Sequence, residues 1–424
     1  MIDRVLKYFA ELSAIPHCSG ATDAMREYLV DFAERLDYEV EVDGAGNILI
    51  RKGTPSLTLQ AHYDMVCVGR APDIGIYEEG GWLRARDSSL GADNGMAVAM
   101  MMVLMEERYE LEYLLSNDEE IGLIGAKALD FELRGDYLLN LDTEEEGQIY
   151  IGCAGGSDIV ASGDFGVIDD GRESWIVSVE NLPGGHSGVD IDKNIPNAIQ
   201  LLCGYLLEEG VDIVSLEGGE RRNSIAANAS AIVKAEKPPI ERGGVRVLEC
   251  ERDYGHIYKD SEKILRMLSS LPHGVISIDE ELAIPHSSLN LAIVEIKEGR
   301  GRIDYSLRAM SDETLLTLEE ELSAQLLKYE MSVSVEDRYP AWRPEKSRLS
   351  RALHDIMRER FASCSYRAIH AGLECGILSL RYPHMQMASI GPLIENPHST
   401  RERVNIESVG RTFEALLEIV ESFA

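Results

Sequence analysis

Polar side chains that suit a divalent metal ion follow several short apolar runs of the sequence. His62 and Asp64 come after the apolar run 57–61, and Asp142 comes after the run 137–141. The other candidates of this kind are Asp93, Glu119, Glu120 and His398. If the apolar runs are strands of an open α/β sheet, these residues lie beyond the carboxyl ends of the strands, where such sheets bind ligands. Two histidines with several carboxylates suit Zn²⁺ or a similar ion, and they are numerous enough for two ions.

Each of these residues also has an ordinary structural explanation. A histidine such as His62, at the end of an apolar strand, is more often a buried side chain with a hydrogen-bond partner. Asp93 in LGADNG is by default a helix cap, and the adjacent Glu119 and Glu120 are favoured at a helix start by the helix dipole. The spacing of His62 and Asp64 favours the ligand role, because alternate strand residues point to one face. A carboxylate there can fix the orientation of the imidazole.

The first third of the chain alternates between strand and helix patterns. Strand-like runs occupy residues 38–42, 48–50, 57–61, 113–115 and 137–141, and helical patterns occupy residues 22–36 and about 96–107. This alternation is typical of a parallel or mixed α/β sheet. The acidic trio 144–146 that follows is expected to be a solvated turn.

The middle of the chain has a different pattern, which indicates an α+β unit with antiparallel strands. Alternating runs at 175–179 and 229–235 flank a helix near 197–208, a hairpin is predicted at 289–307, and a helix follows at about 313–329. Strand–helix alternation then returns at 367–370, 385–390 and 406–423. We therefore predict a two-domain protein. An α/β catalytic domain with a mixed central sheet, residues 1–157 and 338–424, is interrupted by an inserted α+β lid domain with an antiparallel sheet, residues 158–337.

The composition restricts the location and the partners of the chain. Among its 424 residues, 41 Lys and Arg stand against 74 Asp and Glu, and the net charge of −33 argues against nucleic acid or an anionic membrane as a partner. No apolar run approaches the ~18–20 residues that span a bilayer, and the start of the chain predicts an amphipathic helix instead of an export signal. The seven cysteines are scattered without CxxC spacing, which argues against a disulfide framework and a thiolate zinc site. These features predict a cytoplasmic protein.

Several strings of the sequence carry a family resemblance. In chain order they are AHYDMV, LGADNG, DEEIGLIGA, NLDTEEEGQIYIGCAGG, LPGGHSGVDI, HAGLECG and NPHSTRERVNIESV. Together they resemble the aminoacyl-histidine dipeptidases, a branch of the co-catalytic zinc peptidase family that also holds carnosinase and glutamate-releasing carboxypeptidases. The resemblance runs from about residue 15 to residue 409, which is nearly the whole chain.

The resemblance implies two divalent metal ions per chain, Zn²⁺ in the first place, with Mn²⁺ or Co²⁺ as alternatives. His62 and Asp142 resemble the ligands of one ion, and Glu120 and His398 resemble those of the other. Asp93 resembles the aspartate that bridges both ions.

Three further residues near this centre also acquire roles by resemblance. Asn94 resembles a residue joined to the bridging aspartate by a cis peptide, and Asp64 resembles the group that orients His62. Glu119 resembles a general base, which takes a proton from water and returns it to the leaving amine.

The inserted domain supplies candidates that the resemblance alone favours. Taken by itself, His186 in GGHSG reads as a loop residue with a local hydrogen bond. The resemblance implies instead that His186 reaches the active site of a second subunit, in a homodimer formed through the lid domain, and stabilises an oxyanion there. Asn223 and Arg308 resemble groups that hold the substrate backbone and its C-terminal carboxylate, for which the guanidinium fork is suited. Gly372 resembles a backbone contact to that carboxylate.

These observations predict a di-metal hydrolase that cleaves unblocked dipeptides, of the Xaa-His or β-alanyl-His type or of broader range. Two alternatives stay open: an amidohydrolase that deacylates N-acyl amino acids, and a metal-binding module without turnover. Glu119 argues against the module, because binding alone needs no base. A nucleophilic pair of Cys375 and His370 is disfavoured, because metal-dependent chemistry explains the constellation better.

Overall fold

The chain folds into two compact units in the computed structural model, which describes residues 1–252 and 254–423. The first unit holds Met1–Gly152, Pro344–Ala368 and the residues from Leu373 onward, and the second holds Cys153–Arg343 and Ile369–Gly372. These limits differ by a few residues from the predicted 157/158 and 337/338. The reason is that strand pairing in the second unit continues to its very ends, where Cys153 bridges to Trp342.

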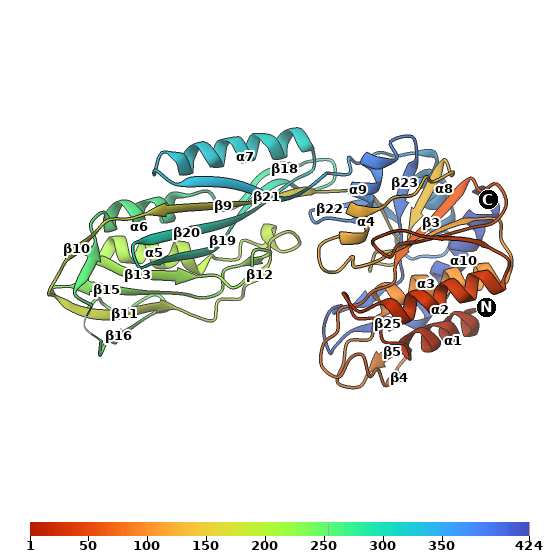
Figure 1. Ribbon diagram of the computed structural model, residues 1–424, viewed down its shortest axis with the longest axis horizontal. Helices are drawn as coiled ribbons and strands as arrows, with labels where there is room; N and C mark the ends of the chain where they lie inside the picture. Colours follow the sequence, from red (N-terminus) through yellow and green to blue (C-terminus); the bar gives the residue numbers. More distant parts are fainter. Residues whose placement is uncertain (253, 424) are drawn as a thin grey trace. The chain divides into compact units, whose positions relative to one another are not determined.

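An eight-stranded mixed sheet forms the centre of the first unit, in the order β1-β2-β6-β3-β7-β23-β8-β22. Its strands are β1 (Glu39–Val42), β2 (Ile48–Arg51), β3 (Leu57–His62), β6 (Glu112–Ser116), β7 (Tyr137–Asn140), β8 (Gln148–Cys153), β22 (Ser365–Ile369) and β23 (Gln386–Ser389). The central strands β6, β3, β7 and β23 are parallel, whereas β2 and β8 pair antiparallel to them. The carboxyl ends of the parallel strands therefore meet at one edge of the sheet (Figure 1).

Helices surround this sheet and complete its core. They are α1 (Ile2–Ser13), α2 (Asp23–Arg35), α3 (Ala92–Glu106), α4 (Ile124–Ala128), α8 (Arg348–Met357), α9 (Glu374–Arg381) and α10 (Ile406–Phe423). Residues 96–105 of α3 are buried on every side, as expected for a helix that is apolar all round. A smaller sheet, in the order β24-β25-β5-β4, belongs to the same unit: β24 (Ile394–Glu395), β25 (Arg403–Asn405), β5 (Trp82–Ala85) and β4 (Ile76–Glu79).

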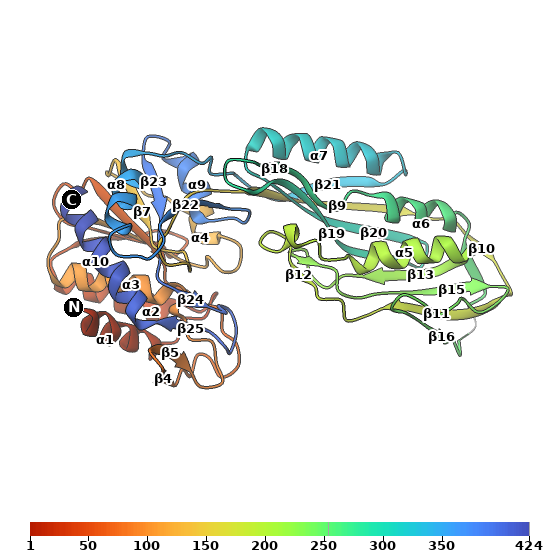
Figure 2. The same ribbon diagram turned by 180° about the vertical axis from the view of Figure 1, so that it is seen from behind.

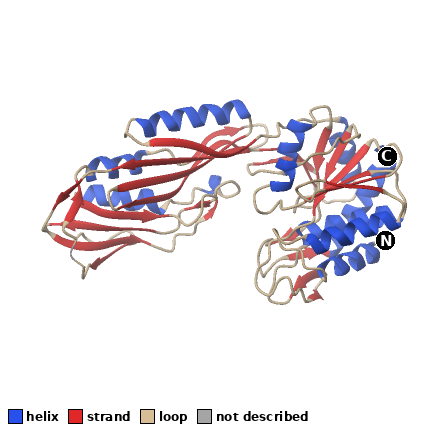
Figure 3. Cartoon of the chain, in the orientation of Figure 1, coloured by secondary structure: helices blue, strands red, loops and turns tan. Residues whose placement is uncertain are grey.

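The second unit is built on a nine-stranded antiparallel sheet with its own core (Figures 1 and 3). Its strands are β9 (Gly155–Asp164), β11 (Glu173–Val179), β13 (Asp212–Gly218), β15 (Ala229–Ala235), β16 (Val245–Glu249), β18 (Gly274–Asp279), β19 (Ile284–Lys297), β20 (Arg300–Ala309) and β21 (Ser332–Tyr339). Helices α5 (Ala198–Glu209), α6 (Ser261–Ser270) and α7 (Asp312–Leu327) share one apolar cluster with this sheet. Two short ribbons, β10 (Val167–Asp169) with β17 (His256–Tyr258) and β12 (Gly185–His186) with β14 (Ser224–Ile225), and the 3-10 turn η1 (Ile191–Lys193) complete the unit.

The predicted architecture is confirmed, an α/β domain with a mixed sheet and an inserted unit with an antiparallel sheet. The helix expected at 22–36 is α2, and the hairpin expected at 289–307 is β19 with β20, whose strands run alongside one another in Figure 2. None of the described helices has the length and apolar character that crossing a membrane requires.

The prediction from the cysteines is wrong at one place, because Cys18 and Cys67 form a disulfide. Their segments pair through the main chain, since Met65 donates its N–H to the carbonyl of His17 at 3.1 Å and Ser19 donates to Met65 at 3.1 Å. This pairing brings the two cysteines to a Cα–Cα distance of 5.5 Å, which the bare spacing of the cysteines did not reveal.

Candidate active site

The metal-ligand candidates converge at the carboxyl edge of the first sheet. β3 ends at His62, the loop after β6 carries Glu119 and Glu120, and the loop after β7 carries Asp142. Asp93 opens α3, and His398 lies between β24 and β25. Their nitrogen and oxygen atoms form overlapping groups within 4.8 Å of one another: His62 with Asp93 and Asp142, His62 with Glu119 and Glu120, and Asp93 with Glu120 and His398.

Asp93 occupies the middle of this constellation. Its Oδ1 lies 3.2 Å from Nε2 of His62, and its Oδ2 lies 3.1 Å from Nε2 of His398. Each histidine nitrogen also faces a second carboxylate, with Asp142 Oδ1 at 3.3 Å from His62 and Glu120 Oε1 at 2.9 Å from His398. The arrangement therefore has two halves, each with one imidazole and one terminal carboxylate, and the Asp93 carboxylate presents one oxygen to each half.

The electrostatics of the site are dominated by buried carboxylates. Burial opposes a charge on the His62 ring, but Asp142 and the neighbouring aspartates raise the pKa of His62 well above its usual value. Desolvation would lower the pKa of His398, but the neighbouring carboxylates of Asp93 and Glu120 raise it to about 11. Burial raises the pKa of Asp142 and of Glu120. Negative charge is thus concentrated where a cation would stabilise it.

Two observations test whether a pair of divalent ions fits these residues. The donor set is imidazole nitrogen and carboxylate oxygen, which suits Zn²⁺ and related ions. Oε1 of Glu120 is buried and makes no hydrogen bond of acceptable geometry within the described chain, so it remains available as a ligand atom. The residues of this cluster therefore fit a pair of divalent metal ions.

Glu119 and Asp64 lie against this cluster without completing either half. Burial, followed by repulsion from Asp142, Glu120 and other carboxylates, raises the pKa of Glu119 well above its usual range. Asp64 accepts the N–H of Glu119 at 3.0 Å and the hydroxyl of Ser19 at 2.7 Å. Nδ1 of His62 lies 3.0 Å from the main-chain oxygen of Asp64 and 3.4 Å from its carboxylate, so the closer acceptor is the main-chain oxygen.

The segment that carries Asp93 has the peptide geometry that the resemblance implied. The bond between Asp93 and Asn94 is cis. The Asn94 side chain donates to the main-chain oxygen of Leu141 at 2.8 Å, next to Asp142. This contact links the start of α3 to the loop after β7.

Sequence reasoning missed three carboxylates of the first unit. Glu144 was expected in a solvated turn, but it is largely buried, and burial together with repulsion from Asp93 raises its pKa to about 8. Glu374 is fully buried beside Gln60 and Ser116, and burial raises its pKa to about 7. Glu402 is also buried, and it contacts the main chain before α3. The strings DTEEEG, HAGLECG and STRERV contain them, but such sequences also occur on solvated surfaces.

The candidates of the inserted domain gather within the second unit. His186 pairs with Ser224, next to Asn223, and the N–H of Ser187 donates to the main-chain oxygen of Asn223 at 2.9 Å. Nδ1 of His186 accepts the N–H of Gly188 at 3.1 Å. A Cβ placed on Gly188 would lie 3.0 Å from Nε of Arg308, so this turn approaches the guanidinium closely.

Arg308 is a buried cation, with 8% of its surface exposed. Its Nη1 donates to the Tyr339 hydroxyl at 2.7 Å, and the Tyr339 ring lies 2.9 Å from where a Cβ on Gly372 would stand. Within the described residues, no carboxylate forms an ion pair with Arg308, and its Nε has no hydrogen-bond partner. A buried charge is costly unless it is paired, so this guanidinium is suited to an anionic ligand.

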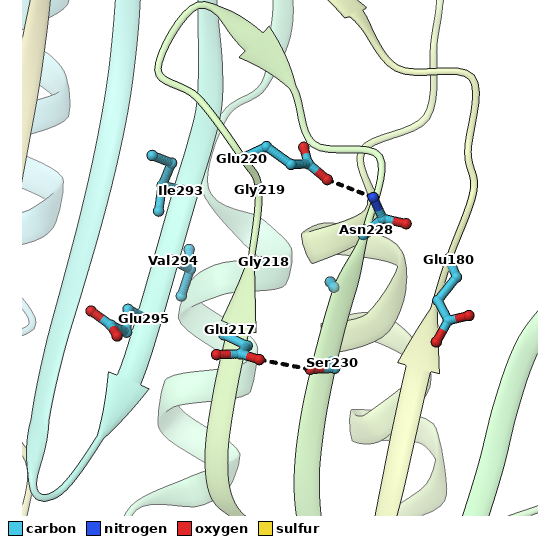
Figure 4. Close-up of a pocket in the computed structure, with 11 residues that line it drawn as sticks. Glu180, Glu217, Gly218, Gly219, Glu220, Asn228, Ser230, Ile293, Val294 and Glu295 are labelled. Carbon is cyan, nitrogen blue, oxygen red and sulfur yellow. Dashed lines mark hydrogen bonds between the residues drawn. The ribbon is translucent and has the colours of Figure 1, made fainter.

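The second unit also carries an acidic hollow of about 610 Å³, shown in Figure 4. Its walls come from β13, β15 and β19, and Glu217 accepts from Ser230 while Glu220 accepts from Asn228. None of the candidate site residues lines it.

Comparison with known proteins places the chain in a family. Residues 58–422 match the family described as Peptidase family M20/M25/M40. The chain belongs to this family. It is 32% identical to the cytosol non-specific dipeptidase of Escherichia coli (strain K12) over 97% of this chain and 96% of that protein. The predicted membership of the co-catalytic peptidase family is therefore confirmed.

Solved structures agree with the fold. The aminoacylhistidine dipeptidase of Vibrio alginolyticus superposes with a TM-score of 0.83 at 28% identity, covering 99% of this chain and 96% of that chain. A tripeptidase of Staphylococcus aureus gives 0.62 at 17% identity, covering 100% and 98%, and this likeness speaks for the fold alone.

Proposed function

We propose that the chain is a metal-dependent dipeptidase that hydrolyses the peptide bond of unblocked dipeptides. The observation that carries the proposal is Asp93, whose two carboxylate oxygens face two histidines, each of which faces a second carboxylate. Two relatives of the chain are a non-specific dipeptidase and an aminoacylhistidine dipeptidase, and this supports a dipeptide substrate, with Xaa-His and β-alanyl-His among the candidates.

Two divalent ions per chain, Zn²⁺ in the first place and Mn²⁺ or Co²⁺ as alternatives, belong to this proposal. His62 and Asp142 would hold one ion, Glu120 and His398 the other, and Asp93 both. When bound, such a pair supplies Lewis acidity for the scissile carbonyl and lowers the pKa of a water molecule.

Glu119 takes the proton in the proposed reaction. Its carboxyl lies within 4.8 Å of ligand atoms of His62 and Glu120, but it belongs to neither half of the cluster around Asp93. Its position beside His62 and Glu120 suits a base that accepts a proton from the attacking water and then gives it to the leaving amine. Asp64 fixes the loop of Glu119 through the main-chain N–H.

The second unit would recognise the substrate. We assign the C-terminal carboxylate to Arg308 and the main chain at Gly372, and the substrate backbone to Asn223. His186 would donate to the oxyanion in the site of a second subunit of a homodimer. A subunit-exchange assay tests this role: mixed His186→Ala and Glu119→Gln chains should regain activity, because some mixed dimers combine an intact Glu119 with an intact His186. Mixed dimers without activity would return His186 to a loop-stabilising role.

We also propose a cytoplasmic location. The Escherichia coli relative is a cytosol dipeptidase, and this supports the proposal. The cytosol keeps most thiols reduced, so the Cys18–Cys67 disulfide would be exposed to reduction there.

A substrate panel tests the proposed function against its alternatives. The metal-supplemented chain is assayed with dipeptides, including Ala-His and β-alanyl-His, and with N-acetyl and N-succinyl amino acids; Glu119→Gln is the matched inactive control. Hydrolysis of the dipeptides alone is the expected result. Hydrolysis of the N-acyl compounds alone would favour the deacylase. No turnover of either set with metal bound would favour the binding module.

A further inference from the structure

Glu402 makes an unusual set of contacts with the main chain before and at the start of α3. Its Oε2 accepts the N–H groups of Leu90 at 2.7 Å and Gly91 at 3.1 Å, and its Oε1 accepts those of Ala92 at 2.8 Å and Asp93 at 3.4 Å. The side chain is 3% exposed. One carboxylate therefore fixes four consecutive peptide groups, the last of which belongs to the residue at the centre of the site.

The main chain of Glu402 is anchored beside the other half of the site, which contains His398. Glu402 closes the short loop that begins at His398, and its N–H donates to the main-chain oxygen of Ser399 at 3.1 Å. The next residue, Arg403, opens β25 and pairs with Arg84 of β5. Glu402 is thus held by a sheet on one side and holds the Asp93 segment on the other, and it ties together two segments that are far apart in sequence.

A simple helix cap accounts for only part of this geometry. A carboxylate at a helix N-terminus is stabilised by the free N–H groups and the helix dipole. However, Leu90 and Gly91 precede α3, so two of the four bonds lie outside the helix. Gly91 has a φ of 72°, which residues other than glycine rarely adopt. The contacts of Glu402 therefore determine the path of the main chain into Asp93.

We propose that Glu402 is a positioning residue that sets the Asp93 carboxylate at the distance and direction it has between His62 and His398. The inference rests on the proposed metal centre. Outer groups that orient metal ligands change metal affinity typically by ~10–100-fold when they are replaced. Replacement of Glu402 should therefore weaken metal binding by more than any loss of stability explains.

Calorimetric titration of the full chain with Zn²⁺, after chelation and dialysis, tests this role. Glu402→Gln keeps the shape of the side chain but replaces one acceptor oxygen by an N–H donor. The matched control is Glu112→Gln. Glu112 is fully buried in the same unit and accepts from Arg51, Thr58 and the N–H of Arg134, but it starts β6, at the end opposite to the site.

We expect Glu402→Gln to weaken at least one Zn²⁺-binding step by ~10–100-fold, and Glu112→Gln to keep wild-type affinity although its melting temperature falls. Glu402→Asp keeps the charge with a shorter reach, should give an intermediate loss, and replaces the amide variant if that does not fold. Wild-type affinity for Zn²⁺ in the folded variant would overturn the proposal. If the wild-type chain takes up no Zn²⁺, the proposed function fails first and this inference fails with it.

Discussion

The histidines of the metal-ligand cluster in the first unit and two histidines of the second unit lie in opposite electrostatic surroundings. In the first unit, carboxylates raise the pKa values of the buried His62 and the half-exposed His398. In the second unit, burial lowers the pKa of His273 to about 4 and that of His370 to about 3, and the nearby Arg308 lowers the latter further. The metal-ligand cluster of the first unit thus gathers negative charge around His62 and His398. In the second unit, the lowered pKa values favour the neutral form of His273 and His370, and His370 lies near the guanidinium of Arg308.

This difference in charge indicates which kind of ligand each unit can bind. Clustered carboxylates repel one another, and a cation relieves that repulsion. A buried guanidinium with a hydroxyl as its neighbour, as at Arg308 and Tyr339, gains most from a carboxylate ligand. We infer that one unit is built for metal ions and the other for the anionic end of a substrate.

The largest effect should come from Asp93→Ala, which removes the centre of the carboxylate cluster. Both halves of the site lose a ligand atom, and two ions would be left close together with less compensating charge. We expect dipeptide hydrolysis at background level and metal content well below that of the wild type. Elemental analysis of the purified variant checks this. Retention of the wild-type metal content would contradict the central role of Asp93.

Glu119→Gln should separate proton transfer from metal binding in the first unit. It removes the proton acceptor and leaves the groups around Asp93 intact, so kcat should fall by at least ~10²-fold while metal content stays nearly unchanged. Glu120→Ala is the paired control, and it should lose metal first. If Glu119→Gln retains more than about a tenth of the wild-type kcat, Glu119 is not the base.

The site residues of the first unit could largely be predicted from the sequence, whereas those of the second unit could be predicted less well. His62 and Asp142 were found because short apolar strands of regular pattern end just before them, and residue type then indicated metals. The roles of His186 and Arg308 came only from family resemblance, because a histidine in a glycine-rich turn and an arginine on a strand are common. Glu402 could not be found, since its bonds to 90–93 join segments that only the tertiary fold brings together. The same holds for the Cys18–Cys67 disulfide.

Arg308→Met tests whether the second unit binds the anionic end of the substrate. Charge-assisted hydrogen bonds contribute about 1.5–3 kcal/mol, so KM for dipeptides should rise by ~10–100-fold with a smaller change in kcat. Dipeptide amides lack the carboxylate, and their hydrolysis should be affected much less. Arg302→Met on the same strand is the control, because Arg302 is already ion-paired with Asp304. Equal losses for dipeptides and their amides would contradict the assignment.

The smallest effect concerns His370 and the pH dependence of stability. The ring is 5% exposed, its Nε2 lies 2.7 Å from the Ser288 hydroxyl, and its pKa of about 3 is below the usual 6.5. Between these values the unfolded chain binds a proton that the folded chain does not, so the free energy of unfolding falls as the pH falls from 6.5 towards 3. The stabilisation that the neutral His370 contributes is fully present above pH 6.5. Below that pH, the free energy of unfolding changes by at most about 1.4 kcal/mol per pH unit because of this group.

His370→Gln removes this titration while keeping a polar side chain. Urea unfolding at pH 7, 6 and 5, in the presence of a chelator so that metal binding does not contribute, should show a shallower loss of stability in the variant than in the wild type. His384→Gln is the control for the loss of an imidazole, because His384 is exposed. An identical slope in His370→Gln and the wild type would show that His370 takes up its proton equally in both states, and the contrast between the two units would then rest on Arg308 and His273 alone.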